Sequence, residues 1–196
     1  MRRTREQWVA TICAVMAFAV YAADIQKADN RDALSLGSSW MDGIAPGTND
    51  VAVWNGATAA SGPWTYGLGT NVAWYGLSVT NAVSMLTITN DGSVLTLGAG
   101  GMILSNSYNC LNCAPVALAA LQAWRFAGST ILYQWGAVSG EGPLTLGDSG
   151  SWGQFTVYGD HLAVDGGSRC RVADTRRGLV RRHTGGYTGV HGHLVG

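Results

Sequence analysis

The chain has 196 residues, in which 12 basic residues balance 12 acidic ones and 47% of the residues are hydrophobic. This hydrophobic share can bury a core, which excludes a disordered chain. The balanced charge argues against a nucleic-acid-binding protein, which usually has a basic face. Charged residues make up only 12%, and the 28 glycines are about twice the usual share. Because this composition is poor for long helices, we predict an all-β protein with many turns.

Residues 1–22 have the pattern of a secretory signal peptide. Arginines at positions 2, 3 and 5 precede an apolar run over residues 8–20, and Ala22 is the small residue before the predicted cleavage site. The run is too short to cross a bilayer as a helix, which takes about 20 apolar residues. We therefore expect an exported protein, secreted or held in the cell envelope or on its outer surface, with no membrane span after signal cleavage.

Residues 23–80 are predicted to form an N-terminal cap and the first strands. They contain half of the eight tryptophans, namely Trp40, Trp54, Trp64 and Trp74. The first layer of a stacked β-structure has unpaired backbone groups and an apolar end, which large rings can cover. We expect these rings to be buried, with each indole N–H bonded to a polar group. In the alternative, the tryptophans lie on the surface and bind sugars, and the protein is a carbohydrate-binding module.

A period of two dominates residues 81–168, the predicted solenoid. Nine pairs of apolar residues, each separated by one residue, begin between residues 86 and 162, as expected for short strands between turns. The two members of a pair share one face of a strand, and glycine-rich turns separate the pairs. The pairs begin at Leu86, Leu95, Met102, Val116, Trp124, Ile131, Leu144, Phe155 and Leu162.

A repeated tetrapeptide favours a solenoid over a sandwich. The sequence Leu-Thr-Leu-Gly occurs at residues 95–98 and again at 144–147, which are 49 residues apart. Two coils of about 24 residues fit this distance and lie within the range of stacked repeats. We therefore predict a short parallel β-helix with a tryptophan-rich N-terminal cap, and we keep an antiparallel β-sandwich as the alternative.

The cap segment also carries a resemblance. The ordered residues of 27–30, 34–40 and 43–54 resemble the N-terminal segment of exported bacterial proteins with autotransporter-associated β-strand repeats, and residues 74–81 followed by 86–88 resemble that family's entry into its first coils. The resemblance implies a right-handed parallel β-helix, secreted or displayed at the cell surface, with an adhesive or structural role and no catalytic residues. It also assigns structural positions in the cap to Trp40, Pro46, Asp50, Trp54 and Trp74.

Residues 169–196 differ from the rest of the chain. Six arginines lie between positions 169 and 182, three of the four histidines follow them, and the apolar alternation stops. Blocks of like charge are commonly solvated tails, so we predict a tail that is disordered or follows a break in the reading frame. The alternative is a basic tail that binds polyanions or surface polysaccharide.

Two cysteines of the predicted solenoid have C-x-x-C spacing, Cys110 and Cys113. No second pair completes a zinc site, so no metal is predicted. In an oxidising compartment the two can form a small disulfide loop; alternatively they are two small residues of a turn. Cys13 is removed with the signal, and a disulfide between Cys110 and Cys113 would leave Cys170 free.

No catalytic, cofactor-binding or metal-binding set stands out in the sequence. A solenoid enzyme for acidic polysaccharides needs several carboxylates on one outer face; the candidates are Asp148, Asp160 and Asp165, of which the first and the last occupy turns. We predict a non-enzymatic, adhesin-like solenoid, a truncated passenger fragment that presents Thr/Ser/Asn-rich faces to surface glycans or other envelope proteins. The alternatives are a carbohydrate-binding module and a polysaccharide-processing β-helix enzyme.

Overall fold

The computed structural model describes residues 22–56, 64–128, 130–140 and 143–147, together with the backbone of four later strands. The predicted signal peptide lies almost entirely outside the described residues, as does most of the segment 169–196. The elements are β1 (Ala23–Gln26), η1 (Gly37–Ser39), β2 (Asp50–Asn55), β3 (Trp64–Tyr66), β4 (Val72–Thr80), β5 (Leu86–Ile88), β6 (Leu95–Ser105), β7 (Cys110–Asn112), β8 (Val116–Leu118), β9 (Gln122–Ala127), β10 (Ile131–Gln134), β11 (Val138–Gly140), β12 (Leu144–Leu146), β13 (Gln154–Tyr158), β14 (Leu162–Val164), β15 (Arg171–Val172) and β16 (Val180–His183).

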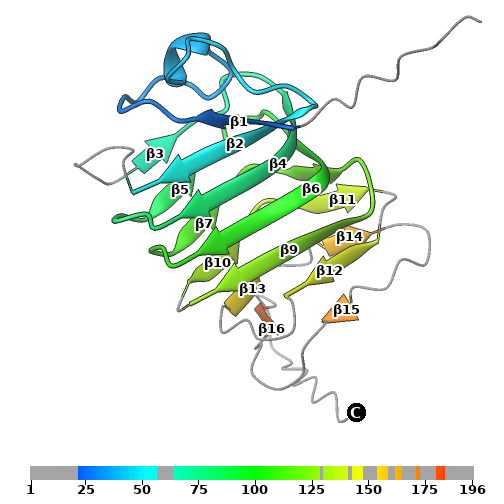
Figure 1. Cartoon of the computed structure of the whole chain (residues 1–196). Helices are drawn as coiled ribbons and strands as arrows, with labels where there is room; N and C mark the ends of the chain where they lie inside the picture. The colour runs from blue at the N-terminus through cyan, green and yellow to red at the C-terminus, as the bar shows by residue number, and fades with distance from the viewer. Residues whose placement is uncertain are drawn as a thin grey trace, which may run out of the picture.

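The chain winds as a coil, and its strands form two sheets in which neighbouring strands are parallel (Figure 1). The ten-stranded sheet has the order β1-β2-β4-β6-β8-β11-β14, with β9, β12 and β15 continuing the second half of β6, and the six-stranded sheet has the order β16-β13-β10-β7-β5-β3. Each turn begins in the six-stranded sheet and continues through the ten-stranded one. The successive turns are β3 with β4, β5 with β6, β7 to β9, β10 to β12, and β13 to β15. About five turns result, which confirms the predicted β-solenoid and excludes the antiparallel sandwich.

The length of a turn agrees with the prediction, but the equivalence of the repeated tetrapeptides does not. Leu95 pairs with Val116, which pairs with Val138, so these turns take 21 and 22 residues. Leu144 instead pairs with Gln122, in the neighbouring column. The two Leu-Thr-Leu-Gly segments therefore occupy different positions in their turns. Turns differ in length because their corners differ, so a distance along the chain does not fix a position in the coil.

All nine predicted apolar pairs fall within strands, and among the seven pairs whose burial the structure describes, one has the wrong phase. In β10 the buried residues are Leu132 and Gln134, whereas Ile131 and Tyr133, expected to face inward, are only half-buried. The neighbouring turn explains the difference. Leu132 pairs with Cys110 and Gln134 with Asn112, and the Asn112 amide donates to Gln134 Oε1 at 3.0 Å.

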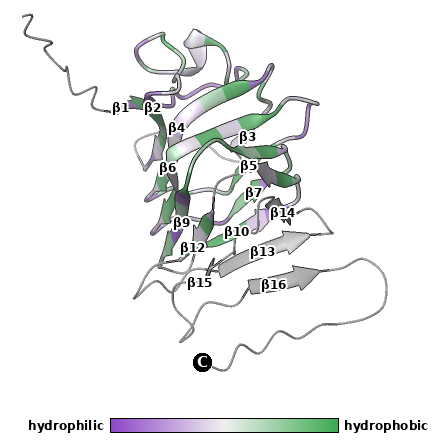
Figure 2. Ribbon diagram, turned by 90° about the vertical axis from the view of Figure 1, so that its right-hand side faces the viewer, coloured by the Kyte–Doolittle hydropathy of each residue, from purple (hydrophilic) through white to green (hydrophobic). Residues whose placement is uncertain are grey.

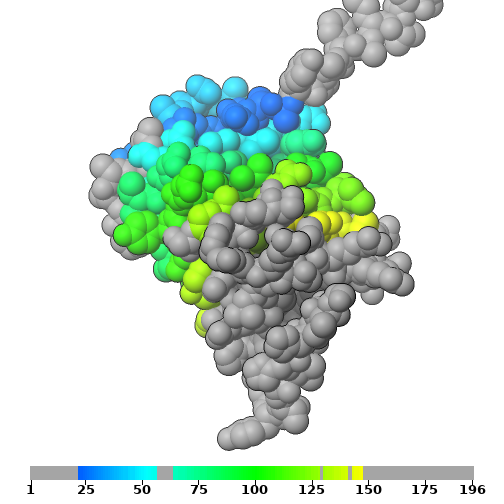
Figure 3. All heavy atoms as spheres, turned by 60° about the horizontal axis from the view of Figure 1, so that its bottom comes forward, coloured from blue at the N-terminus to red at the C-terminus, as the bar shows by residue number. Residues whose placement is uncertain are grey.

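Inward side chains of successive turns stack as columns between the sheets. One column of the ten-stranded sheet contains Ala52, Leu77, Met102 and Trp124, all of which are buried. Hydropathy changes from residue to residue along β4 and β6, as Figure 2 shows, because alternate side chains point to opposite faces. The turns appear as successive bands of colour in Figure 3. Burying each large aliphatic side chain contributes about 1.5–3 kcal/mol.

Two strands of the arginine-rich segment continue the ladders. The backbone of β15 pairs with β12, and that of β16 pairs with β13 in a parallel register that joins Val180 to Phe155. The predicted disorder of residues 169–196 therefore does not extend to the backbone of these two strands, whereas the break in the reading frame stays a prediction. The other residues of the segment lie outside the described part of the chain.

Candidate functional surfaces

An aromatic cluster closes the N-terminal end of the column. The centroid of the Trp40 ring lies 5.4 Å from that of Trp54 and 5.8 Å from that of Trp74, and both pairs are nearly edge-to-face. The centroid of the Tyr66 ring lies 6.2 Å from that of Trp54. Such edge-to-face pairs are favourable for aromatic rings. Each of these four side chains, and that of Trp64, is at most 2% exposed. The four tryptophans of the cap therefore do not form a surface for binding sugars, which corrects that alternative.

The indole nitrogens of the cluster differ in their partners. Trp40 Nε1 donates to the Leu34 carbonyl at 2.9 Å, whereas the indole nitrogens of Trp54, Trp64 and Trp74 are buried without an acceptor. The expectation that each indole N–H finds a polar partner is therefore wrong for three of the four. These rings stand in columns whose neighbours are mostly apolar side chains. Each buried donor without a partner costs about 1–3 kcal/mol.

The other two predicted cap residues shape the turn into β2. The Gly47 N–H donates to Asp50 Oδ2 at 2.8 Å, and the Asp50 N–H donates to the Gly47 carbonyl at 3.0 Å. Pro46 is buried just before this turn. The turn directs β2 along β1 and places Trp54 under Trp40. The structure thus brings all five predicted cap residues to one end of the molecule.

Lys27 is a buried cation for which the sequence predicted no role. Its ammonium donates to the carbonyls of Ala28 at 3.0 Å and Asn30 at 3.1 Å and to Asn30 Oδ1 at 2.9 Å. It lies 4.5 Å from the centroid of the Tyr66 ring, a cation–π geometry. Desolvation lowers the pKa of Lys27 to about 8, although the negative charges of Asp32 and Asp29 raise it. Burial also raises the pKa of the Tyr66 phenol.

The two cysteines of the C-x-x-C motif are free thiols. Cys110 begins β7, whose extended backbone advances about 3.3 Å per residue. Cys113 therefore lies beyond the roughly 7 Å between Cα atoms that a disulfide tolerates, and the predicted disulfide loop is not formed. Burial raises the pKa of the Cys110 thiol to about 12 and also raises that of Cys113, so neither resembles an activated thiol.

Carboxylates of the described turns hold backbone in place. Asp91 accepts from the Gly69 N–H at 2.6 Å and from the Ser93 N–H at 3.0 Å, which joins corners of two successive turns. The bond from Gly69 is the main cause of a lowered Asp91 pKa. Within the described residues, no group of three His, Cys, Asp or Glu side chains could hold a metal ion. Asp148, Asp160 and Asp165 lie outside the described residues.

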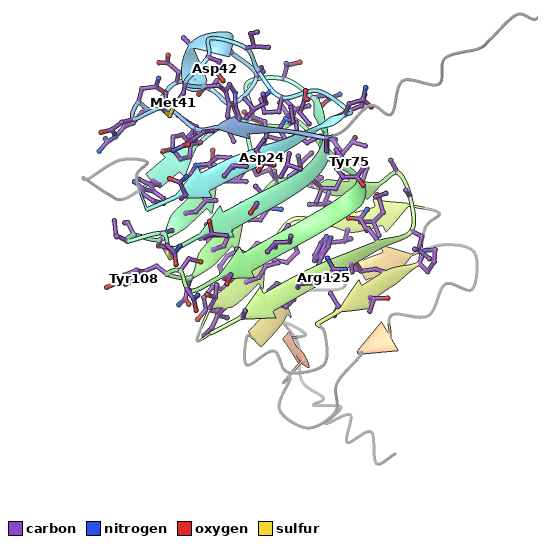
Figure 4. All side chains as sticks on the ribbon, in the orientation of Figure 1. Asp24, Met41, Asp42, Tyr75, Tyr108 and Arg125 are labelled. Carbon is purple, nitrogen blue, oxygen red and sulfur yellow. The ribbon has the colours of Figure 1, made fainter. Side chains whose placement is uncertain are left out.

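The outward faces of the sheets carry few charges. Between β1 and β12 the strands contain three charged residues, Asp24, Asp50 and Arg125. Figure 4 shows Asp24 near the N-terminal end of the ten-stranded sheet and Arg125 several strands away. Hydroxyl groups alternate with small and aliphatic side chains in the outward columns, so the faces are less rich in Thr, Ser and Asn than expected. The columns are Val53–Ser78–Ile103–Arg125, Ala73–Thr96–Ala117–Ser139 and Thr65–Thr87–Leu111–Tyr133.

Comparisons with models of known protein families, with curated proteins and with solved structures gave no match for this chain. Among the described residues, no helix has the length and apolar character needed to span a membrane.

Proposed function

We propose that this protein is an exported, non-enzymatic, adhesin-like rod, the front part of a passenger-like chain similar to proteins with autotransporter-associated repeats. The β-solenoid itself supports the rod, since stacked turns form an extended and stiff surface. The signal-like residues 1–22 and the resemblance of the cap segment support the export and the relationship.

The observation that carries the proposal is the nearly uncharged outer face of β2, β4, β6 and β9. Its central residues are Val53, Ser78 and Ile103, of which Ile103 is 36% exposed. Rungs about 4.8 Å apart repeat along this face. A flat surface of hydroxyl and aliphatic groups suits neutral surface glycans or another envelope protein, and it suits neither nucleic acid nor an acidic polymer.

Binding of the purified protein to cell surfaces tests this role. We expect Ser78→Lys together with Ile103→Lys to weaken binding at least tenfold, because two charges would stand in the middle of the face. The matched control is Thr65→Lys with Thr87→Lys, which changes neighbouring turns of the six-stranded sheet and should leave binding unchanged. Equal binding by both double variants, or no binding by the unmodified protein, would contradict the proposal.

Export has a separate test. The full chain is produced in a Gram-negative host, and the N-terminus of the mature protein is determined by mass spectrometry. We expect cleavage after Ala22, and Ala22→Arg should block it because the cleavage site requires a small residue. An uncleaved chain in the cytoplasm would contradict export without affecting the assignment of the binding face.

A further inference from the structure

Residues 27–40 form a strap across the N-terminal end of the solenoid. The strap begins at Lys27, whose backbone N–H donates to the Val53 carbonyl at 2.8 Å, and it returns to Lys27 through an antiparallel bridge with Trp40. Leu34 lies in the middle and is fully buried, and its N–H donates to the Gly67 carbonyl at 3.0 Å. The strap therefore covers the first turn from β2 on one side to the end of β3 on the other. The loop with Met41 and Asp42 follows it (Figure 4).

The polar side chains of the strap bind mainly to the strap itself. Asn30 Nδ2 donates to the Ser38 carbonyl at 2.6 Å, Ser38 Oγ donates to Asp32 Oδ2 at 2.6 Å, and Ser39 Oγ donates to the Asp32 carbonyl at 2.8 Å. Contacts with the first turn are fewer. They include three backbone hydrogen bonds, from Lys27, Leu34 and Ser35, the buried side chains of Lys27, Leu34 and Trp40, and the close approach of the Ala33 and Ser35 side chains to Gly69. Strong internal bonds and few external ones are expected of a segment that moves as one unit.

The Lys27 ammonium is the uncommon part of this contact. A buried lysine is usually paired with a carboxylate, but the three oxygens that accept from Lys27 Nζ are neutral and belong to the strap. The side chain therefore brings a charge against the Tyr66 ring. In the open strap this ammonium would be hydrated.

We propose that the strap opens as a unit and that its opening is coupled to proton uptake by Lys27, so that the closed end is held more weakly at neutral pH than at alkaline pH. Opening would uncover the Trp54 and Trp74 rings and the end of the apolar column. The fold would thus contain a proton-sensitive cover over its most hydrophobic end.

Linkage gives the sign and size of the effect. The pKa of Lys27 is about 8 in the closed strap and that of a hydrated lysine is about 10.4, so the open form binds more protons between these values. Raising the pH from 7 to 9 should then lower the opening constant about tenfold.

Other charged and titratable groups surround Lys27. The strap itself carries the negative charges of Asp29 and Asp32 and the positive charge of Arg31. From β3, Tyr66 stays neutral because its pKa is raised. From β2 the contact is the Val53 carbonyl, which does not titrate.

Hydrogen exchange of the full chain, followed by mass spectrometry at pH 7 and pH 9 and corrected for intrinsic exchange rates, tests the proposal. We expect the protection of strap peptides to rise about tenfold with pH, while β6 peptides of the same molecule show no such rise. Lys27→Met should abolish the pH dependence of the strap. Arg31→Met, which removes an exposed cation of the same strap, should keep it, and α-amino groups titrate equally in all variants.

Two results would overturn the proposal. The first is that, in the unmodified chain, the protection of the strap changes with pH no more than the protection of β6. The other is a Lys27→Met protein that keeps the dependence of the unmodified chain. Acrylamide quenching of tryptophan fluorescence gives a second readout, because quenching should fall from pH 7 to pH 9 in the Arg31→Met variant and stay constant in the Lys27→Met variant.

Discussion

The first turn and the third and fourth turns solve the same packing problem with different chemistry. The N-terminal end, where the strap covers the first turn, is filled by Trp40, Trp54 and Trp74, and two of these three rings leave an indole N–H unbonded. In the third and fourth turns, the column that begins with Tyr66 and Ile88 continues instead with the amides of Asn112 and Gln134, and these amides are bonded. Asn112 donates to Gln134, and Gln134 Nε2 donates to the Gly136 carbonyl at 2.8 Å.

The difference follows from where each region lies. An interior turn has a neighbour on both sides, so side chains of similar size and polarity can stack and pair from turn to turn. The first turn has a neighbour on one side only, and its apolar end must be covered by the strap and by large rings. Burial therefore outweighs hydrogen bonding at the end, whereas register and hydrogen bonding dominate inside.

Truncating a ring of the first turn should have the largest effect. We expect Trp54→Ala to lower the free energy of unfolding by about 3–5 kcal/mol, because it leaves a cavity among Trp40, Trp74 and Tyr66. Urea denaturation measures this loss. The control is Trp135→Ala, where 53% of the side chain is exposed and a change of about 0.5 kcal/mol is expected. Similar losses for both variants would contradict the role of the cluster.

Glycines where turns approach closely should come next. Gly101 has a φ of +61°, and a Cβ there would collide with the Ala123 carbonyl of the next turn. We expect Gly101→Ala to cost about 2–4 kcal/mol. Gly92 has a φ of +88° with no atom near its Cβ position, so Gly92→Ala should cost only about 1 kcal/mol. Thermal unfolding measures the loss of stability in each variant. Equal losses for Gly101→Ala and Gly92→Ala would contradict the close stacking of β6 on β9.

The amide pair of the interior turns should contribute less and should show coupling. Asn112→Leu and Gln134→Leu should each cost about 1–3 kcal/mol, because a partner is left buried without its bond. The double variant should cost less than the sum, by about 0.5–3 kcal/mol. A double-mutant cycle in urea measures this coupling. Additive losses would show that the two amides act independently.

The thiols should differ in reactivity without any effect on stability. In a chain with Cys13→Ser and Cys170→Ser, we expect Ellman's reagent at pH 8 to modify Cys113 roughly a hundredfold faster than Cys110, whose thiol is buried and seldom ionised. In urea the two rates should converge. Equal rates in the folded protein would place Cys110 outside the core, and rapid formation of a Cys110–Cys113 disulfide would require β7 to be broken.

Much of the fold could be predicted from local pattern. The apolar pairs at Leu86, Leu95 and Met102 lie in β5 and β6 as expected, because alternation and glycine corners are properties of neighbouring residues. The phase of β10 could not be predicted from the strand alone. Its inward pair could be Ile131 with Tyr133 or Leu132 with Gln134, and only the neighbouring strand β7 selects the second pair. For the same reason the role of Lys27 was missed, because its acceptors become visible only when the strap is closed over Tyr66.

The amino-acid sequence by itself determined that short strands alternate with tight corners and that a turn takes roughly two dozen residues. Only the tertiary structure decided which residues stack on which, where the strap closes, and which indole N–H groups of the cap have no acceptor. The physical reason is that periodicity depends on local backbone geometry, whereas register depends on the volume and hydrogen bonds offered by the adjacent turn. Because the corners differ in length, the periodicity of the strands does not fix the register between turns.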